Sequence, residues 1–352
     1  RRTSSPRMVV SAPAEPLPVV AAEDAPVAIT PHRSDAVRRE VLLGVMFGVV
    51  SAVCYTGTNI ALRGVTRGGD PDWAIWVTCL KSLPSALSAW LILGGRAVRG
   101  LPALPTARTA GLLLGLGLIV QGGGNLFFQW SLAMCGLALA VPTVFATLIL
   151  TGAALGRFWL GEAVTARSAV AMGLLIAAIG LLSLGAEGAA AALPPGPPDV
   201  SPVWWVLQGV LLSALAGVFY GALGVVIRQT TRDSVPLPAT LALVSTTGVV
   251  GLGIPAVIRL GPEILTASAS EWTLMLVAGT LNAIAFFAIG GSLRRIPVVQ
   301  VNLLNASQAA LCALGGVLVY GEPLTAALVG GTALTVAGLV LMSRRSGAEA
   351  RK

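Results

Sequence analysis

Long apolar runs separated by short polar segments form the main pattern of this chain. After residue 40, about ten runs of 18 or more mostly apolar residues follow one another, a length typical of α-helices that cross a bilayer. The pattern predicts an all-α, polytopic membrane protein. Its ten expected transmembrane helices lie at 41–62, 73–94, 110–131, 136–156, 164–184, 203–226, 237–258, 272–292, 296–319 and 323–342.

The apolar pattern occurs twice. Segments that begin at Phe158 and Leu318 each contain the end of one apolar run, a Gly-Glu pair, a few polar residues and a second apolar run. Other matched positions are separated by similar offsets, which drift by a few residues along the chain. They are Gly44 with Gly209, Tyr55 with Tyr220, Arg63 with Arg228, Arg67 with Arg232, Phe127 with Phe286, and Ser131 with Ser292. The drift indicates a duplicated half with small insertions.

Two segments fall outside the expected repeats. Residues 1–36 are rich in Pro, Ala, Ser and Val without helical periodicity, which predicts a disordered tail. Whether this stretch is a native tail, the edge of a fragment or an organellar targeting peptide stays open. Pro and Gly disfavour a helix at 186–202. The expected organisation is a tail (1–36), a first five-helix repeat (37–185), an inter-repeat loop (186–202), a second repeat (203–345) and a tail (346–352).

The distribution of Lys and Arg predicts the orientation. In the expected topology, 16 of these residues flank the spans on the side of the N-terminus, and three, Arg63, Arg67 and Arg259, lie on the other side. Cytoplasmic loops are enriched in Lys and Arg, so we expect both termini in the cytoplasm and the protein in the cytoplasmic (inner) cell membrane. Five spans per half would invert the second half relative to the first.

Composition excludes several classes of protein. Hydrophobic residues make up 55% of the 352 residues and charged residues only 11%, against about 25% charged in ordinary globular domains. The net charge of +8 lies in loops and tails, so no nucleic-acid partner is expected. The four cysteines lie in apolar runs and are read as small buried hydrophobes. The single histidine, His32, lies in the tail, so no metal site or other cofactor is expected.

The chain lacks the common catalytic and nucleotide-binding motifs. It contains no Gly-x-x-x-x-Gly-Lys-Ser/Thr, no His-Glu-x-x-His and no Gly-x-Ser-x-Gly sequence, so neither an ATP-driven pump nor an enzyme is expected. All 15 acidic residues lie in tails, loops or span ends. Proton relays usually need an acidic residue or histidine within the membrane, so a uniporter, exchanger or facilitator fits better.

Lys81 is the charge that falls inside an expected span, on the same face of the second helix as Thr78 and Ser85. A lysine at the bilayer centre costs about 2.5–3.5 kcal/mol on insertion scales. Two interpretations stay open. Lys81 either faces a cavity and meets an anionic group of a substrate, or it snorkels or bonds to a neighbouring helix.

Amide side chains form two stripes on other expected spans. Asn302, Asn305 and Gln308 recur at three-residue spacing on one face of the ninth helix, and Gln121, Asn125 and Gln129 form a stripe at four-residue spacing on the third. Each stripe is either a pocket lining or interhelical glue worth about 0.6–2 kcal/mol per bond. The predicted substrate-binding residues, surrounded by the third, fourth, eighth and ninth spans, are Lys81, Gln121, Asn125, Asn282, Asn302, Asn305 and Gln308.

Glycines and two glutamates carry further expectations. Four glycine pairs at four-residue spacing predict close helix packing, namely Gly44/Gly48, Gly111/Gly115, Gly152/Gly156 and Gly217/Gly221. Three consecutive glycines from Gly122 predict a kink or a cavity wall. Glu162 and Glu322 are expected to stabilise the N-termini of the fifth and tenth helices, with a gating contact to an arginine as the alternative.

The arrangement of these motifs resembles the drug/metabolite transporter superfamily, and in particular its EamA-type members. In that plan each fourth helix ends in Gly-Glu and a Gly-rich fifth helix follows. The residues that match it are Leu160, Gly161, Glu162, Tyr320, Gly321 and Glu322, with Gly173, Gly180, Gly330 and Gly338. Lys81 matches a positive residue frequent in the family's second helix. Pro142 departs from the plan, because it lies earlier in the fourth helix than is usual.

The resemblance implies a ten-helix carrier for small organic solutes, often working outward, by alternating access around a central cavity. Its expected partners are a small-molecule substrate and the lipid bilayer, and both a monomer and a homodimer are compatible with the sequence. A non-transporting membrane scaffold or receptor subunit is the alternative function. A carrier of a plastid or other organelle would differ only in its location.

Overall fold

The computed structural model describes residues 31–184, 197, 199–232, 235–321 and 326–343. Within these residues every regular element is a helix and none is a strand, which confirms the all-α class. The α-helices are α1 (Pro31–Arg63), α2 (Pro71–Val98), α3 (Ala107–Ile119), α4 (Phe127–Leu160), α5 (Ala166–Leu184), α7 (Pro202–Arg232), α8 (Leu237–Leu260), α9 (Ala269–Leu293), α10 (Val298–Asn305), α11 (Ser307–Tyr320) and α12 (Ala326–Ser343).

Eight helical stretches of the described chain are long and apolar enough to cross a membrane. They are Val37–Arg63, Pro71–Val98, Ala107–Leu137, Leu139–Leu160, Trp204–Thr231, Leu237–Thr266, Ala269–Leu293 and Val298–Tyr320. Helices α5 and α12 lie where the fifth and tenth spans were expected, but they are not among these eight. Ten transmembrane helices therefore stay a prediction.

The first helix begins earlier than the sequence pattern suggested. Helix α1 starts at Pro31, so residues 31–36, which were assigned to the disordered tail, are helical. Proline is favoured in the first turn of a helix, where its missing N–H costs no hydrogen bond. The rest of the predicted tail, most of the inter-repeat loop, and the C-terminal tail lie outside the described residues.

Glycine decides where the third and fourth spans bend. The glycine triplet lies in a π-helical turn, η2 (Val120–Leu126), between α3 and α4, which confirms the predicted irregularity. A Cβ on Gly123 would lie 2.4 Å from the Phe219 ring of α7, so the bare backbone admits that ring. Further on, Gly136 has φ 69° and ψ −178°, and the chain turns there from one span into the next.

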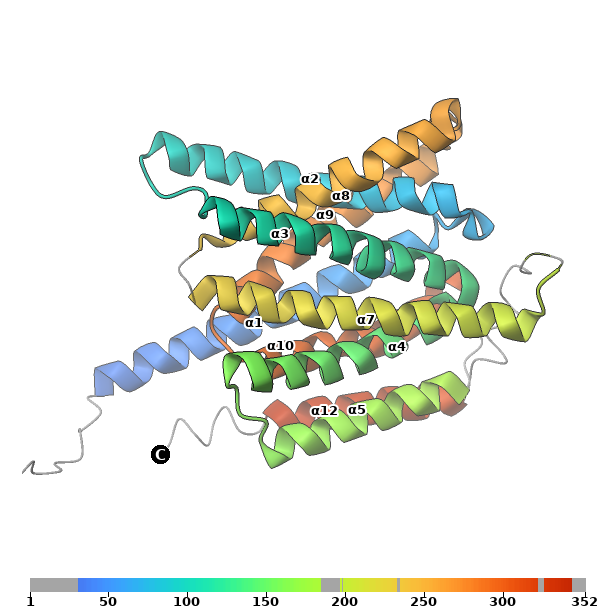
Figure 1. The fold of residues 1–352 in the computed structure, drawn as a ribbon. Helices are drawn as coiled ribbons and strands as arrows, with labels where there is room; N and C mark the ends of the chain where they lie inside the picture. The colour runs from blue at the N-terminus through green and yellow to red at the C-terminus, as the bar shows by residue number, and fades with distance from the viewer. Residues whose placement is uncertain (1–30, 185–196, 198, 233–234, 322–325, 344–352) are drawn as a thin grey trace, which may run out of the picture.

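The two halves of the chain interlock. The most extensive helix–helix contacts join elements of opposite halves: α4 with α7, α2 with α8, α1 with α9, and α5 with α12 (Figure 1). Figure 1 shows α5 and α12 side by side along one edge, next to α4. Separating the halves would therefore remove most of the helix packing.

The α4–α7 contact is a close approach of two backbones. A Cβ on Gly217 would lie 2.0 Å from the Thr147 hydroxyl and 2.2 Å from the Val144 carbonyl oxygen, and one on Gly221 would lie 2.8 Å from the Leu148 carbonyl oxygen. Such spacing lets helices pack in lipid, where apolar burial gives no preference for helix–helix over helix–lipid contact. The packing role predicted for this glycine pair is confirmed.

The other three glycine pairs behave differently from one another. A Cβ on Gly44 or Gly48 would collide with the segment from α9 to α10, and one on Gly152 would collide with the Asn302 side chain, which confirms packing there. The prediction was wrong for Gly111 and Gly115. A Cβ on either would meet open space in the described structure, because both lie on the outward face of α3.

Ion pairs tie the halves together at both ends of the bundle. Two lie where α1 ends and α9 begins, and two lie where α1 begins and α9 ends. The first two are Arg67–Glu271 (2.6 Å) and Arg259–Asp72 (2.9 Å), and the second two are Arg228–Glu162 (3.1 Å) and Arg295–Glu40 (3.0 Å). Each pair joins a residue of the first half to a residue of the second.

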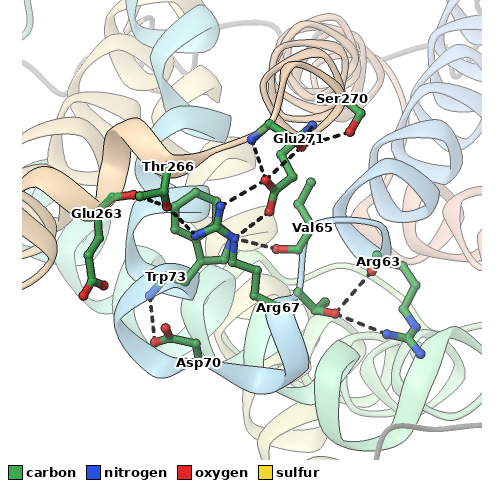
Figure 2. Close-up of polar contacts among 11 residues, drawn as sticks. Arg63, Val65, Arg67, Asp70, Trp73, Glu263, Thr266, Ser270 and Glu271 are labelled. Carbon is green, nitrogen blue, oxygen red and sulfur yellow. Dashed lines mark hydrogen bonds and ion pairs between the residues drawn. The ribbon is translucent and has the colours of Figure 1, made fainter.

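Figure 2 shows the Arg67 pair in its surroundings. The guanidinium of Arg67 donates from Nε to Glu271 Oε1 at 2.6 Å and from Nη2 to Oε2 at 3.0 Å, and it lies 3.5 Å from the Trp73 ring centroid. The hydrogen bond to Glu271 raises the pKa of Arg67. Arg67 has a φ of 42°, a costly conformation for a residue with a side chain. The bidentate pair and the ring stack hold it there.

We expect Gly217→Val to lower the thermal stability of the purified protein. The added methyl groups would collide with the α4 backbone, and overpacking of this kind costs about 1–3 kcal/mol. Thermal unfolding in detergent measures the effect, with Gly115→Val as the matched control because a Cβ at Gly115 meets open space. Equal melting temperatures for the two variants would contradict the close α4–α7 contact.

Candidate functional site

A cavity lies in the middle of the bundle, between the two halves. It holds about 1060 Å³ of space not filled by atoms, counting the part open to solvent. Its wall comes from α1, α2, η2, α4, α7, α8, α9, α10 and α11, so more helices line it than the four spans predicted to surround it. All seven predicted site residues line this cavity: Lys81, Gln121, Asn125, Asn282, Asn302, Asn305 and Gln308.

Lys81 lies in the cavity wall on α2 and is only 5% exposed. Its Nζ donates to Asn125 Oδ1 at 2.5 Å, and the Tyr220 hydroxyl donates to the same oxygen at 2.8 Å. The amino group is thus held inside the protein, and the alternative that Lys81 snorkels to the membrane surface is wrong. Two elements of the first half and one of the second meet at the Asn125 oxygen.

Gln121 orients Asn125 from one turn earlier in η2. Its Oε1 accepts from Asn125 Nδ2 at 2.7 Å and from the Ser82 hydroxyl at 3.3 Å. Its Nε2 donates to the Val244 carbonyl of α8 at 3.2 Å. These bonds fix which atom of the Asn125 amide faces Lys81. Gln121 and Asn125, which lie four residues apart, therefore form one hydrogen-bonded unit that also joins η2 to α2 and α8.

A second network links α1 to α10 and α11. Asn305 Oδ1 accepts from the Ser51 hydroxyl at 3.0 Å and from Gln308 Nε2 at 2.9 Å. Gln308 Oε1 accepts from Asn59 Nδ2 at 3.4 Å, and Asn305 Nδ2 donates to the Val301 carbonyl at 3.1 Å. Asn305 and Gln308 line the cavity and also join helices of opposite halves, so the two interpretations of this stripe do not exclude each other.

Asn302 differs from its two neighbours on the stripe. Its side chain is 4% exposed, and its Nδ2 has no hydrogen-bond partner among the described residues. The amide rests against the α4 backbone, since a Cβ on Gly152 would lie 2.2 Å from Nδ2. A buried donor without a partner costs about 1–3 kcal/mol, so this group is one to which a bound ligand would contribute an acceptor.

Residues 207–344 match the sequence profile of the EamA-like transporter family. The second half of the chain is EamA-like. The family resemblance predicted from the sequence is confirmed over this range, and members of the family are transporters. Together with the eight apolar helices, the match identifies a multi-pass membrane protein.

Comparison with solved structures covers more of the chain's length. Twenty-eight chains of solved structures match it. One of them, titled only "Crystal structure of protein", has a TM-score of 0.59 and 18% sequence identity, and the match covers 85% of the present chain and 98% of that chain. At this identity the likeness concerns the fold alone. No curated protein sequence matches the chain.

The cavity wall also contains residues that the predicted site lacks. Tyr55, Thr58 and Asn59 line it from α1, Tyr220 lines it from α7, and aromatic rings complete it, namely Phe128, Phe145 and Phe286. The tyrosines carried a usable signal, because they occupy matching positions of the repeat. The phenylalanines carried none, since an aromatic residue in an apolar run is equally compatible with lipid.

At the end of the bundle where α1 begins, Glu162 makes the contact with an arginine that was the alternative expectation, and it also accepts a hydrogen bond from a helix of the second half. Its Oε2 accepts from the backbone N–H of Val298 at 3.0 Å, at the N-terminus of α10, and its Oε1 pairs with Arg228. Arg228 also donates to the Leu293 carbonyl. The reason is local: Gly161 ends α4 with a φ of 66°, and the turned chain directs Glu162 toward the second half. Glu322 lies outside the described residues.

Removing the Glu162 carboxylate should destabilise the helical bundle strongly. The side chains of Arg228 and Glu162 are 14% and 7% exposed, and loss of one partner of a buried ion pair costs about 3–5 kcal/mol. We expect Glu162→Ala to lower the melting temperature in detergent far more than Glu40→Ala, which removes a carboxylate that is 59% exposed at the same end. Similar shifts for both variants would show that Glu162 is not a buried anchor.

Proposed function

We propose that this protein is a secondary carrier that moves small organic metabolites across the cytoplasmic membrane by alternating access, with export as its direction. The observation that carries the proposal is the central cavity, whose wall combines helices of both halves and polar side chains from within apolar spans, among them the seven predicted residues. Polar groups at membrane depth are costly, and in membrane proteins they mark solute pathways. The match to a family of transporters supports the same function.

The ion pairs at the two ends of the bundle fit the alternating-access part of this proposal. Rocking one half against the other would open the cavity to one side at a time. Every such movement has to separate the pairs at one end, and each of the four pairs joins the two halves. The described conformation, paired at both ends, corresponds to a closed intermediate in this cycle.

The proposal includes the topology expected from the sequence. Ten transmembrane helices form two inverted five-helix repeats with both termini in the cytoplasm. Two structural parallels support this arrangement. Gly161 and Gly321, at matching repeat positions, end α4 and α11 with nearly equal φ angles of 66° and 67°. Tyr55 and Tyr220, another matched pair, both line the cavity.

Transport tests the role of the stripe on α10 and α11. We expect the double variant Asn305→Ala plus Gln308→Ala to reduce the affinity or rate of solute counterflow in proteoliposomes by at least about tenfold, because two buried amide contacts are lost. Ser307→Ala is the matched control, since the Ser307 hydroxyl donates to the Leu304 carbonyl at the end of the neighbouring α10 and Ser307 does not line the cavity.

Unchanged counterflow in the double variant would contradict the proposed binding role. An absence of flux for the wild-type protein with amino acids, nucleosides, sugars and organic acids, together with a stably co-purifying protein, would favour the non-transporting scaffold instead. Melting temperatures of the variants separate loss of folding from loss of transport.

Breaking one end pair should make the cavity accessible from that end. We expect Glu271→Gln to increase the rate at which an impermeant maleimide labels Thr58→Cys from the outer side, in a background without native cysteines. The substitution removes the bidentate partner of Arg67 while Thr58 lines the cavity. Glu263→Gln, at an exposed position nearby, is the control. An unchanged labelling rate in Glu271→Gln would show that this pair does not hold the outer end closed.

A further inference from the structure

The charge in the cavity is unbalanced. Among the described residues that line it, Lys81 is the one lysine, and none is an aspartate or a glutamate. Lys81 takes part in no ion pair that the described structure contains. A buried cation without a counter-ion is costly, and an anionic ligand would relieve that cost.

We infer that the cavity selects organic monoanions, in which a carboxylate binds Lys81 of the first half and a second acceptor binds Asn302 of the second half. This inference rests on the proposed carrier function and names the class of solute. It excludes organic cations as preferred solutes. It also ranks zwitterions below anions, since the wall contains no carboxylate to receive an ammonium group.

The contacts of Lys81 leave it free to bind an anion. An ammonium group has three donors, and the hydrogen bond to Asn125 Oδ1 uses one of them. The Asn125 oxygen is already saturated, because it accepts from Tyr220 as well as from Lys81, and the amide nitrogen donates to Gln121. The network therefore fixes the position of the ammonium group without neutralising it.

Asn302 supplies the second point of recognition. Asn302 lines the cavity and its buried Nδ2 has no partner among the described residues, whereas the amide nitrogens of Asn305, Gln308 and Gln121 are all engaged. Lys81 lies on α2 and Asn302 on α10, so a ligand with two acceptors would bridge the two halves. Such a ligand would couple solute binding to the relative position of the two halves.

The rest of the wall favours an apolar body on the ligand. Phe128, Phe145 and Phe286 line the cavity together with valine and leucine side chains. A carboxylate with a hydroxyl or carbonyl beside it and an aromatic or branched apolar group would match both donors and these rings. 3-Phenyllactate has this chemistry. Phenylalanine, phenethylamine and 3-phenyllactamide are probes of matched size that are zwitterionic, cationic and neutral.

Binding of these four probes to the purified full-length protein tests the inference. Ligands that bind the native state raise the melting temperature by mass action. We expect 3-phenyllactate to bind at least about tenfold more tightly than each of the other three, since a hydrogen bond to a charged group contributes that much or more. 3-Phenylpropionate, which lacks the hydroxyl, should bind more weakly than 3-phenyllactate.

Two variants assign the selectivity to residues. Lys81→Gln should weaken 3-phenyllactate binding about 10- to 100-fold and bring it level with the neutral amide. Asn302→Asp, which is nearly isosteric, should reverse the preference for anion over zwitterion, so that phenylalanine binds better than 3-phenyllactate, because the added carboxylate balances Lys81 and can receive an ammonium group. Thr78→Val is the matched control, because Thr78 is buried one turn from Lys81, bonds to Ala74 of its own helix and does not line the cavity.

Several outcomes would overturn the inference. They are equal or tighter binding of phenylalanine or phenethylamine by the wild-type protein, no stabilisation by 3-phenyllactate, and an unchanged preference in Asn302→Asp. If Lys81→Gln does not fold, the Asn302→Asp reversal decides the question alone. Counterflow of labelled 3-phenyllactate in proteoliposomes separates the two proposals. Selective binding without flux contradicts the carrier and supports the anion site, whereas equal flux of phenethylamine supports the carrier and contradicts the anion site.

Discussion

The close approach of α4 to α7 is the constraint on which the arrangement of this bundle depends. Gly217 and Gly221 bring two backbones from opposite halves into contact, so that even a Cβ would collide with a carbonyl oxygen. In lipid, packing at this distance contributes van der Waals attraction that larger side chains would prevent. The cavity lies beside this contact, and its wall includes the side chains of Val144 and Leu148 of α4 and Leu223 of α7.

The polar residues of the cavity differ in whether their hydrogen-bonding groups already have partners. Gln121, Asn125, Asn305 and Gln308 bond to one another or to neighbouring helices, so they hold the wall together. Lys81 keeps unused donors, and Asn302 keeps a donor without a partner among the described residues. Because an unmatched buried donor is costly, these two groups are the ones with most to gain from a ligand. Binding energy and structural energy thus come from different members of the same set.

At each end of the bundle, the two ion pairs differ in strength. Arg259–Asp72 and Arg295–Glu40 each include a side chain more than half exposed, and such pairs contribute about 0–1 kcal/mol. Glu162 is buried with Arg228 and also accepts from the N-terminus of α10, and Arg67 is bidentate with Glu271. One strong contact and one weak contact therefore lie at each end. A carrier of this design would have similar resistance to opening on both sides.

The sequence by itself determined the helices, the irregularity at the glycine triplet, the family of the second half and the seven polar residues of the cavity. Polar side chains inside apolar runs cannot face lipid cheaply, so their number and spacing were informative. Only the tertiary structure decided which partners they meet. It showed that Asn302 lacks a partner while Asn305 has several, that Glu162 serves α10, and that Gly111 faces outward. Helical periodicity assigns a residue to a face, but the neighbour on that face comes from a segment often more than 100 residues away, and no local pattern records it.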